Sequence, residues 1–69
     1  MSKSIDTLKL SILFAGCTKR LNIGDMPAEE FVEAMDKGLA AYTQASPEIR
    51  QGVIEVRNKA AEVINRPLI

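Results

Sequence analysis

The fold depends on the stretch LKLSILFAGCTKRL, which runs from Leu8 to Leu21. The stretch begins with alternating apolar and polar residues, continues as a short apolar run, and contains the chain's one cysteine, Cys17, close to two basic residues. These letters are compatible with a bacterial lipoprotein leader, with a β-strand and with a core helix of a soluble protein. Each interpretation predicts a different protein.

A lipoprotein leader needs a basic segment, an apolar segment and small residues before its cysteine. Ala15 and Gly16 fit that pattern, but the apolar run is at the short end for a leader, and Asp6 interrupts the basic segment. Cleavage before Cys17 would also leave only the two helices that the rest of the sequence predicts. We therefore expect a core element in a cytoplasmic protein with no membrane association, and we keep the leader as the weaker interpretation.

A strand at this position would have no second strand to pair with, and its backbone groups would stay unpaired. We therefore predict a helix over about residues 4–20. Its apolar residues fall on nearly every side, and such a helix must be surrounded. Two helices of the same chain can cover one side, so we predict that the other side contacts a second copy or a different protein. The residues predicted for this oligomer or partner interface are Leu8, Leu10, Ile12, Leu13, Phe14 and Cys17.

Turn signals at residues 22–25 and 45–47 separate two further helices from the first. The last helix has the clearest beginning, because Ser46 is a good N-cap and Pro47 suits the first helical position.

Apolar spacing predicts the middle helix over about 27–44 and the last over about 47–65. The predicted fold is all-α, a compact three-helix domain over residues 1–69 that assembles into a helical homo-oligomer.

Small size supports the prediction of self-association. A single core in a chain of 69 residues supplies only roughly 3–5 kcal/mol. One cysteine excludes an internal disulfide, and without histidine the chain cannot provide the four nitrogen and sulfur ligands of a structural zinc site. Assembly with further copies is the remaining source of additional stability. We predict no cofactor and no metal.

Small residues lie together on one side of the predicted middle helix. A glycine inside a helix costs about 1 kcal/mol relative to alanine, and the close approach of another helix would explain that cost. The residues predicted for close helix packing are Ala34, Gly38, Ala41 and Ala45.

Arg50 and Arg57 lie two turns apart at the margin of the last helix's apolar face. In the expected arrangement their stems cover the core and their guanidinium groups pair with carboxylates of the middle helix. In the functional alternative they are candidate anion contacts, which hold a small anionic ligand at a subunit interface.

The sequence gives little support for catalysis. It has no histidine, the commonest general base, and no glycine-rich phosphate loop, while Cys17 has no evident activator and is expected to lie buried as a small apolar residue. We predict that the protein is not an enzyme. Our leading hypothesis is a small helical protein that self-associates and acts by binding a protein partner, as a regulator, adaptor or inhibitor.

Two alternative functions stay open. The segment around Asn22 to Gly24 has the layout of a helix-turn-helix, which would make the protein a dimeric DNA-binding regulator. Nucleic acid is the weaker partner, because Glu29, Glu30 and Glu33 would lie on the recognition helix and repel phosphates. The other alternative is an oligomeric protein that sequesters a small anionic ligand near Arg50 and Arg57.

Overall fold

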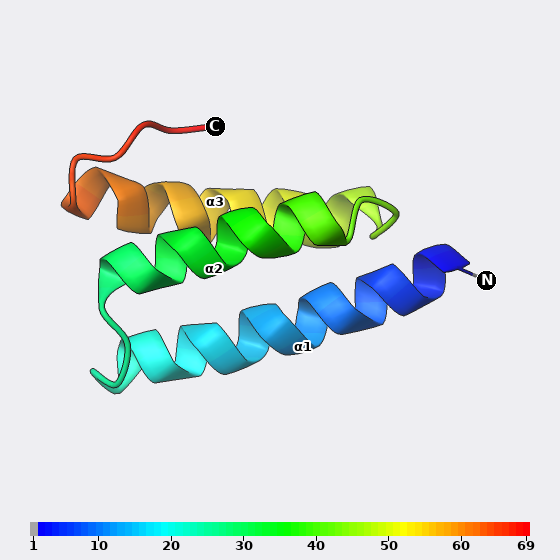
Figure 1. The fold of residues 1–69 in the computed structure, drawn as a ribbon, viewed down its shortest axis with the longest axis horizontal. Helices are drawn as coiled ribbons and strands as arrows, with labels where there is room; N and C mark the ends of the chain where they lie inside the picture. The colour runs from blue at the N-terminus through cyan, green and yellow to red at the C-terminus, as the bar shows by residue number, and fades with distance from the viewer. Residues whose placement is uncertain (1) are drawn as a thin grey trace.

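A computed structural model describes the backbone of residues 2–69 and the side chains from Ile5 onward. The chain forms three α-helices, which are α1 (Ser2–Asn22), α2 (Ala28–Ala41) and α3 (Pro47–Val63). Each helix runs antiparallel to the one before it, so α1 and α3 point the same way (Figure 1). The predicted all-helical fold with three helices is therefore confirmed, and the described residues contain no strand.

The core lies where the three helices meet. Its largest fully buried side chains are Leu10 from α1, Phe31, Val32 and Met35 from α2, and Val53 from α3. The molecule measures 36 × 23 × 16 Å, and α2 lies between α1 and α3 in the view down the shortest axis (Figure 1). In this flat arrangement α1 has helices on one side only, so its opposite side faces away from the core.

The first helix is longer than predicted at both ends, and Gly24 explains where it stops. Gly24 has a φ of 79°, in the left-handed region that glycine adopts without strain. The Asp25 amide donates to the Arg20 carbonyl at 2.8 Å, and the Gly24 amide donates to the Leu21 carbonyl at 3.2 Å. These two bonds form a Schellman motif, which satisfies the last carbonyls of α1.

The second helix ends at Ala41, earlier than the predicted end at Gln44. Nη1 of Arg50 donates to the carbonyls of Leu39 and Tyr42, both at 3.0 Å, and so caps this end from α3. The Gln44 amide donates to Oδ2 of Asp6 at 2.9 Å, so contacts with the other two helices replace the last predicted turn.

The third helix begins at Pro47 as predicted, and Oγ of Ser46 accepts from the Ile49 amide at 3.5 Å. It ends at Val63, not at the predicted Asn65. Asn65 has a φ of 59°, a conformation that asparagine tolerates better than most residues and that a helix cannot continue through.

Candidate functional site

The candidate site is the side of α1 that faces away from the bundle, and it is best defined against the side that faces inward. Leu10 is fully buried and Cys17 is nearly so, and both belong to the common core. Leu13 and Phe14 are half-buried and pack against that core. These residues cover the inward side of α1 with the chain's own helices.

The outward side of α1 is also apolar. The exposed fractions are 53% for Ile5, 61% for Leu8 and 63% for Ile12, and Ala15 is exposed as well. These four residues follow one another at intervals of three, four and three, which places them along one line of a helix. We call Ile5, Leu8, Ile12 and Ala15 the outer stripe. Three large aliphatic side chains therefore lie in one line on the solvent-facing side of this helix.

Positive charge accompanies the outer stripe. Lys9 and Lys19 are exposed, and neither forms an ion pair with any residue in the described part of the chain. Arg20 is paired with Asp25, with 3.3 Å between Nε and Oδ2. The one acidic residue of α1, Asp6, is half-buried and accepts from the Gln44 amide. The surface offered by α1 is therefore apolar and basic.

The six residues predicted for an oligomer or partner interface thus lie on both sides of α1. Leu10 and Cys17 lie within the chain's own core, so an interface of the intact bundle cannot reach their side chains. Leu8 and Ile12 lie on the outer stripe, and the half-buried Leu13 and Phe14 lie between the core and that stripe. Ile5 belongs to the outer stripe, but it was absent from the predicted interface. Its spacing from Leu8 and Ile12 is the signal that could have identified it.

The residues predicted for close helix packing are also divided by the structure. Gly38 lies directly against α1, because a Cβ added there would be 2.6 Å from Cδ2 of Leu13 and 3.2 Å from Cδ1 of Leu10. Ala34 is half-buried and Ala41 is exposed. Ala45 is buried but lies beyond the end of α2, so it belongs to the turn and not to a helical ridge.

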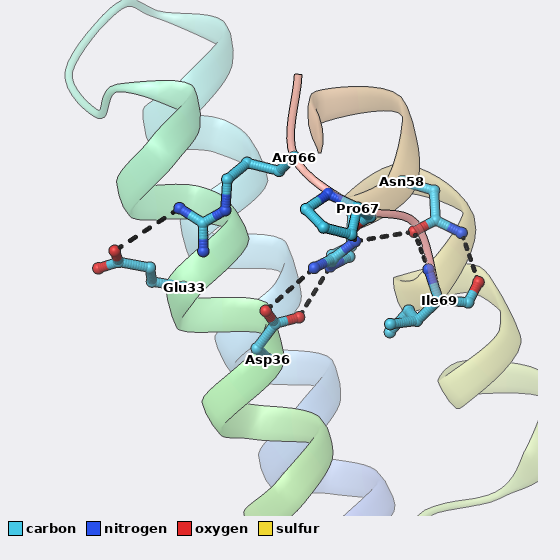
Figure 2. Close-up of polar contacts among 7 residues, drawn as sticks. Glu33, Asp36, Asn58, Arg66, Pro67 and Ile69 are labelled. Carbon is cyan, nitrogen blue, oxygen red and sulfur yellow. Dashed lines mark hydrogen bonds and ion pairs between the residues drawn. The ribbon is translucent and has the colours of Figure 1, made fainter. Parts of the chain in front are cut away.

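Arg57 is the centre of a polar network between α2 and the C-terminal segment. Its side chain is almost completely buried, with 4% of the residue exposed. Nε and Nη2 donate to the two carboxylate oxygens of Asp36 at 2.8 and 3.1 Å, and Nη1 donates to the Pro67 carbonyl at 2.6 Å (Figure 2). The hydrogen bonds to Asp36 raise the pKa of the Arg57 guanidinium above its ordinary value, despite the opposing effect of burial.

Asn58 extends this network to the end of the chain. Nη1 of Arg57 donates to Oδ1 of Asn58 at 3.1 Å. The Asn58 side chain in turn donates to the Ile69 carbonyl at 2.9 Å and accepts from the Ile69 amide at 3.1 Å (Figure 2). The residues after α3 are thereby held against the helix.

The two arginines therefore have separate partners within the chain. Arg57 pairs with a carboxylate of α2, as expected, whereas Arg50 caps α2 through backbone carbonyls. A ligand anion at Arg57 would have to compete with Asp36, which already neutralises the guanidinium group. The anion site stays a prediction, and these contacts give it no support.

Two shallow depressions lie elsewhere on the surface. One, of about 270 Å³, lies between α1 and α2 above Gly38; the other, of about 530 Å³, follows one side of α3 around Gly52. The residues lining the two depressions are Leu13, Ala34, Lys37, Gly38, Ala41 and Tyr42 in the first, and Pro47, Glu48, Gln51, Gly52 and Glu55 in the second.

The helix that would be the recognition helix of a helix-turn-helix carries acidic side chains on its surface. Glu29, Glu30 and Glu33 of α2 are all exposed, which opposes an approach to phosphates. Among the described residues, none of the helices has the length and apolar character needed to cross a bilayer.

Comparisons with known proteins add no relative to this description. The chain matches no protein-family model, and no curated protein or solved structure shows significant similarity to it.

Proposed function

We propose that this chain is a small, non-enzymatic helical protein that self-associates through the outer stripe of α1 and acts by binding a protein partner. The observation that carries the proposal is the exposure of Ile5, Leu8 and Ile12 on one line of a helix whose other side is already packed. Full burial of such a side chain contributes about 1.5–3 kcal/mol, so covering three half-exposed ones is a substantial driving force.

A second group of exposed aliphatic side chains supports binding to a different protein. Val63 lies in the last turn of α3, and Leu68 and Ile69 lie in the segment after it; all three are exposed. Self-association through α1 would leave these side chains available. A regulator, adaptor or inhibitor could hold its partner through these side chains while it is assembled through α1.

We propose a non-enzymatic protein because reactive side chains that could take part in catalysis are buried or already paired. The thiol that could act as a nucleophile belongs to Cys17, which is buried. Of the arginines, Arg57 is engaged by Asp36 and by backbone and side-chain oxygens. The outer stripe, by contrast, is apolar and exposed, and such a surface suits binding.

Sedimentation equilibrium over micromolar to millimolar concentrations tests the proposed self-association. The wild-type chain should show a mean mass that rises above 7.6 kDa with concentration, whereas a Leu8→Ser/Ile12→Ser variant should stay at that value. A matched Gln51→Ser variant, altered at an exposed site of α3, should behave as the wild type does. A wild-type chain that stays monomeric throughout would contradict the proposal.

A further inference from the structure

We propose that the exposed side of α1 binds the surface of an anionic lipid bilayer, with the helix lying flat and the outer stripe facing the acyl chains. This inference goes beyond the proposed function, since a bilayer and another protein molecule would compete for the same stripe. Three features support it, which are the line of aliphatic side chains, the basic side chains beside that line and the place of α1 at an edge of the molecule (Figure 1).

The aliphatic line continues past the end of α1. The Ile23 amide donates to the Lys19 carbonyl at 3.1 Å, as it would in a further helical turn, so Ile23 follows the line of the outer stripe. Its exposed fraction is 68%. With the three of the outer stripe, four large aliphatic side chains lie along one side of a helix of 21 residues, about 31 Å long. Such a line allows a helix to lie in the plane of a membrane surface.

The exposed charges of α1 are basic. Lys9 and Lys19 form no ion pair with a described residue, and Lys19 lies on the aliphatic line itself. Arg20 pairs with Asp25, but the two side chains are 50% and 65% exposed, and such a pair is weak enough to leave Arg20 free to reach lipid phosphates. Three cations against one carboxylate complement an anionic surface. Their long stems can lie against acyl chains while the charged ends reach the headgroups.

Most of the acidic side chains of α2 are directed elsewhere. The Oε2 atoms of Glu29 and Glu33 lie 3.7 and 3.9 Å from Nη1 of Arg66. Asp36 binds Arg57, so three of the four acidic residues of α2 reach toward α3 and the segment after it. The chain has a formal net charge of zero, but its charges are separated across the molecule. The basic side is the one that carries the outer stripe.

The position of α1 suits a flat, adaptable surface. α1 forms one long edge of the bundle, with the other helices on its opposite side, so a plane can touch it along its length (Figure 1). The two depressions described above contain no residue of the outer stripe. A protein interface packs by shape complementarity, whereas fluid lipid chains adapt to a convex helix.

The proposed contact is peripheral, since none of the described helices could cross a bilayer. The sequence favours no membrane association, because the lipoprotein leader is its weaker interpretation. Surface binding depends instead on which side of α1 stays exposed, and this becomes visible only in the folded chain.

Co-sedimentation of the intact chain with vesicles tests the proposal. Vesicles of phosphatidylcholine alone are compared with vesicles in which one third of the lipid is phosphatidylserine. The α1 variants are Ile12→Ser and the double variant Lys9→Gln/Lys19→Gln. Val63→Ser and Lys59→Gln, at exposed sites of α3, are their matched controls. Circular dichroism establishes that each variant is folded.

The wild-type chain should bind the phosphatidylserine vesicles and bind phosphatidylcholine far more weakly. Each lysine near an anionic membrane strengthens binding about fivefold, so the double lysine variant should bind about 25-fold less tightly. Ile12→Ser should lose about tenfold, because a large aliphatic contact is removed. The α3 controls should bind as the wild type does. No binding of the wild-type chain, or equal losses in the α1 and α3 variants, would overturn the proposal.

Lipid nanodiscs with spin-labelled acyl chains locate the contact in the wild-type protein. The label should broaden the methyl signals of Ile5, Leu8 and Ile12 more than those of Leu68 and Ile69, which are also exposed. The reverse order would overturn the proposal, because a different surface would then face the lipid.

Sedimentation equilibrium separates this inference from the proposed function. A chain that stays at 7.6 kDa in solution and binds the vesicles supports the inference and contradicts self-association. A chain that self-associates without binding the vesicles overturns the inference alone. Binding to polyglutamate but not to the vesicles would assign the basic side to an acidic protein and overturn the lipid proposal.

Discussion

The two halves of this bundle use apolar and charged residues in opposite ways. Between α2 and the C-terminal segment a charged side chain, Arg57, lies inside the molecule and is matched by Asp36. On α1 large aliphatic side chains lie outside, and none of the described residues covers them. The residues that hold the fold together, such as Arg57 and Asp36, have their partners within the same chain. The described residues provide no such partner for the outer stripe, which is why we propose that it binds another molecule.

The largest difference is expected between two variants that place a carboxylate on the buried side and on the exposed side of α1. Leu10→Asp should unfold the protein, because an unpaired buried charge costs about 3–5 kcal/mol, as much as the whole core supplies. Ile12→Asp, two residues away, should leave the monomer folded. Thermal unfolding of both variants, followed by circular dichroism below the self-association range, provides the measurement. Loss of the fold in Ile12→Asp would show that the outer stripe belongs to the core.

The second prediction removes the partner of the buried charge. Asp36→Ala should lower the free energy of unfolding by about 2–3 kcal/mol, because Arg57 would stay buried without its carboxylate. We expect less than for a fully enclosed pair, since the Asp36 side chain is 40% exposed. Urea unfolding measures the change.

Glu33→Ala is the matched control for that variant. Oε2 of Glu33 lies 3.9 Å from Nη1 of Arg66 (Figure 2), and the two side chains are 54% and 35% exposed. Such a pair contributes little, so the free energy of unfolding should change by less than about 0.5 kcal/mol. Equal effects of the two substitutions would contradict the distinction between the buried and the exposed pair.

The third prediction concerns the place where α1 approaches α2. Gly38→Leu should destabilise the fold by about 1–3 kcal/mol, because its side chain would overlap Leu13 and Leu10. Gly52→Ala, at a helical position of α3 with open space around it, should instead stabilise the protein by about 0.5–1 kcal/mol. Chemical denaturation of the two variants gives the comparison. A stabilising Gly38→Leu would mean that α1 does not pack closely on α2.

The last prediction concerns a buried hydroxyl on α1. Oγ1 of Thr18 is buried, and among the described side chains it is the one buried polar atom without a hydrogen-bond partner. Thr18→Val keeps the shape and removes the unpaired group, so stability should be unchanged or higher by up to about 1 kcal/mol. Thr43→Val, at an exposed site, is the control for differential scanning calorimetry. A clear loss of stability in Thr18→Val would reveal a polar partner for this hydroxyl.

Much of the fold could be predicted from local signals. The beginning of α3 follows from Ser46 and Pro47, whose preferences act within one turn of chain. The end of α2 could not be found in this way, because Arg50 reaches its carbonyls from another helix. The burial of Arg57 could be anticipated only in part, since the sequence has several carboxylates on α2 and periodicity does not choose Asp36 among them.

The candidate site was predicted less completely than the fold, and the reason lies in α1 itself. A helix that is apolar on two opposite sides gives no amphipathic direction, so the sequence alone cannot say which side joins the core. The predicted interface therefore combined Leu10 and Cys17 with Leu8 and Ile12, which the packing of α2 and α3 separates. The heptad spacing from Ile5 to Ala15 was present in the sequence, but only the structure shows that this line faces outward.

The most direct test of the central claim follows the methyl groups of α1 by NMR during a dilution series. We predict that the methyl signals of Ile5, Leu8 and Ile12 shift with protein concentration, while those of Leu10 and Val53 in the core stay constant. This result would show that the two sides of one helix have separate roles. Signals of the outer stripe that do not move at any concentration, or that move only together with those of the core, would contradict the account.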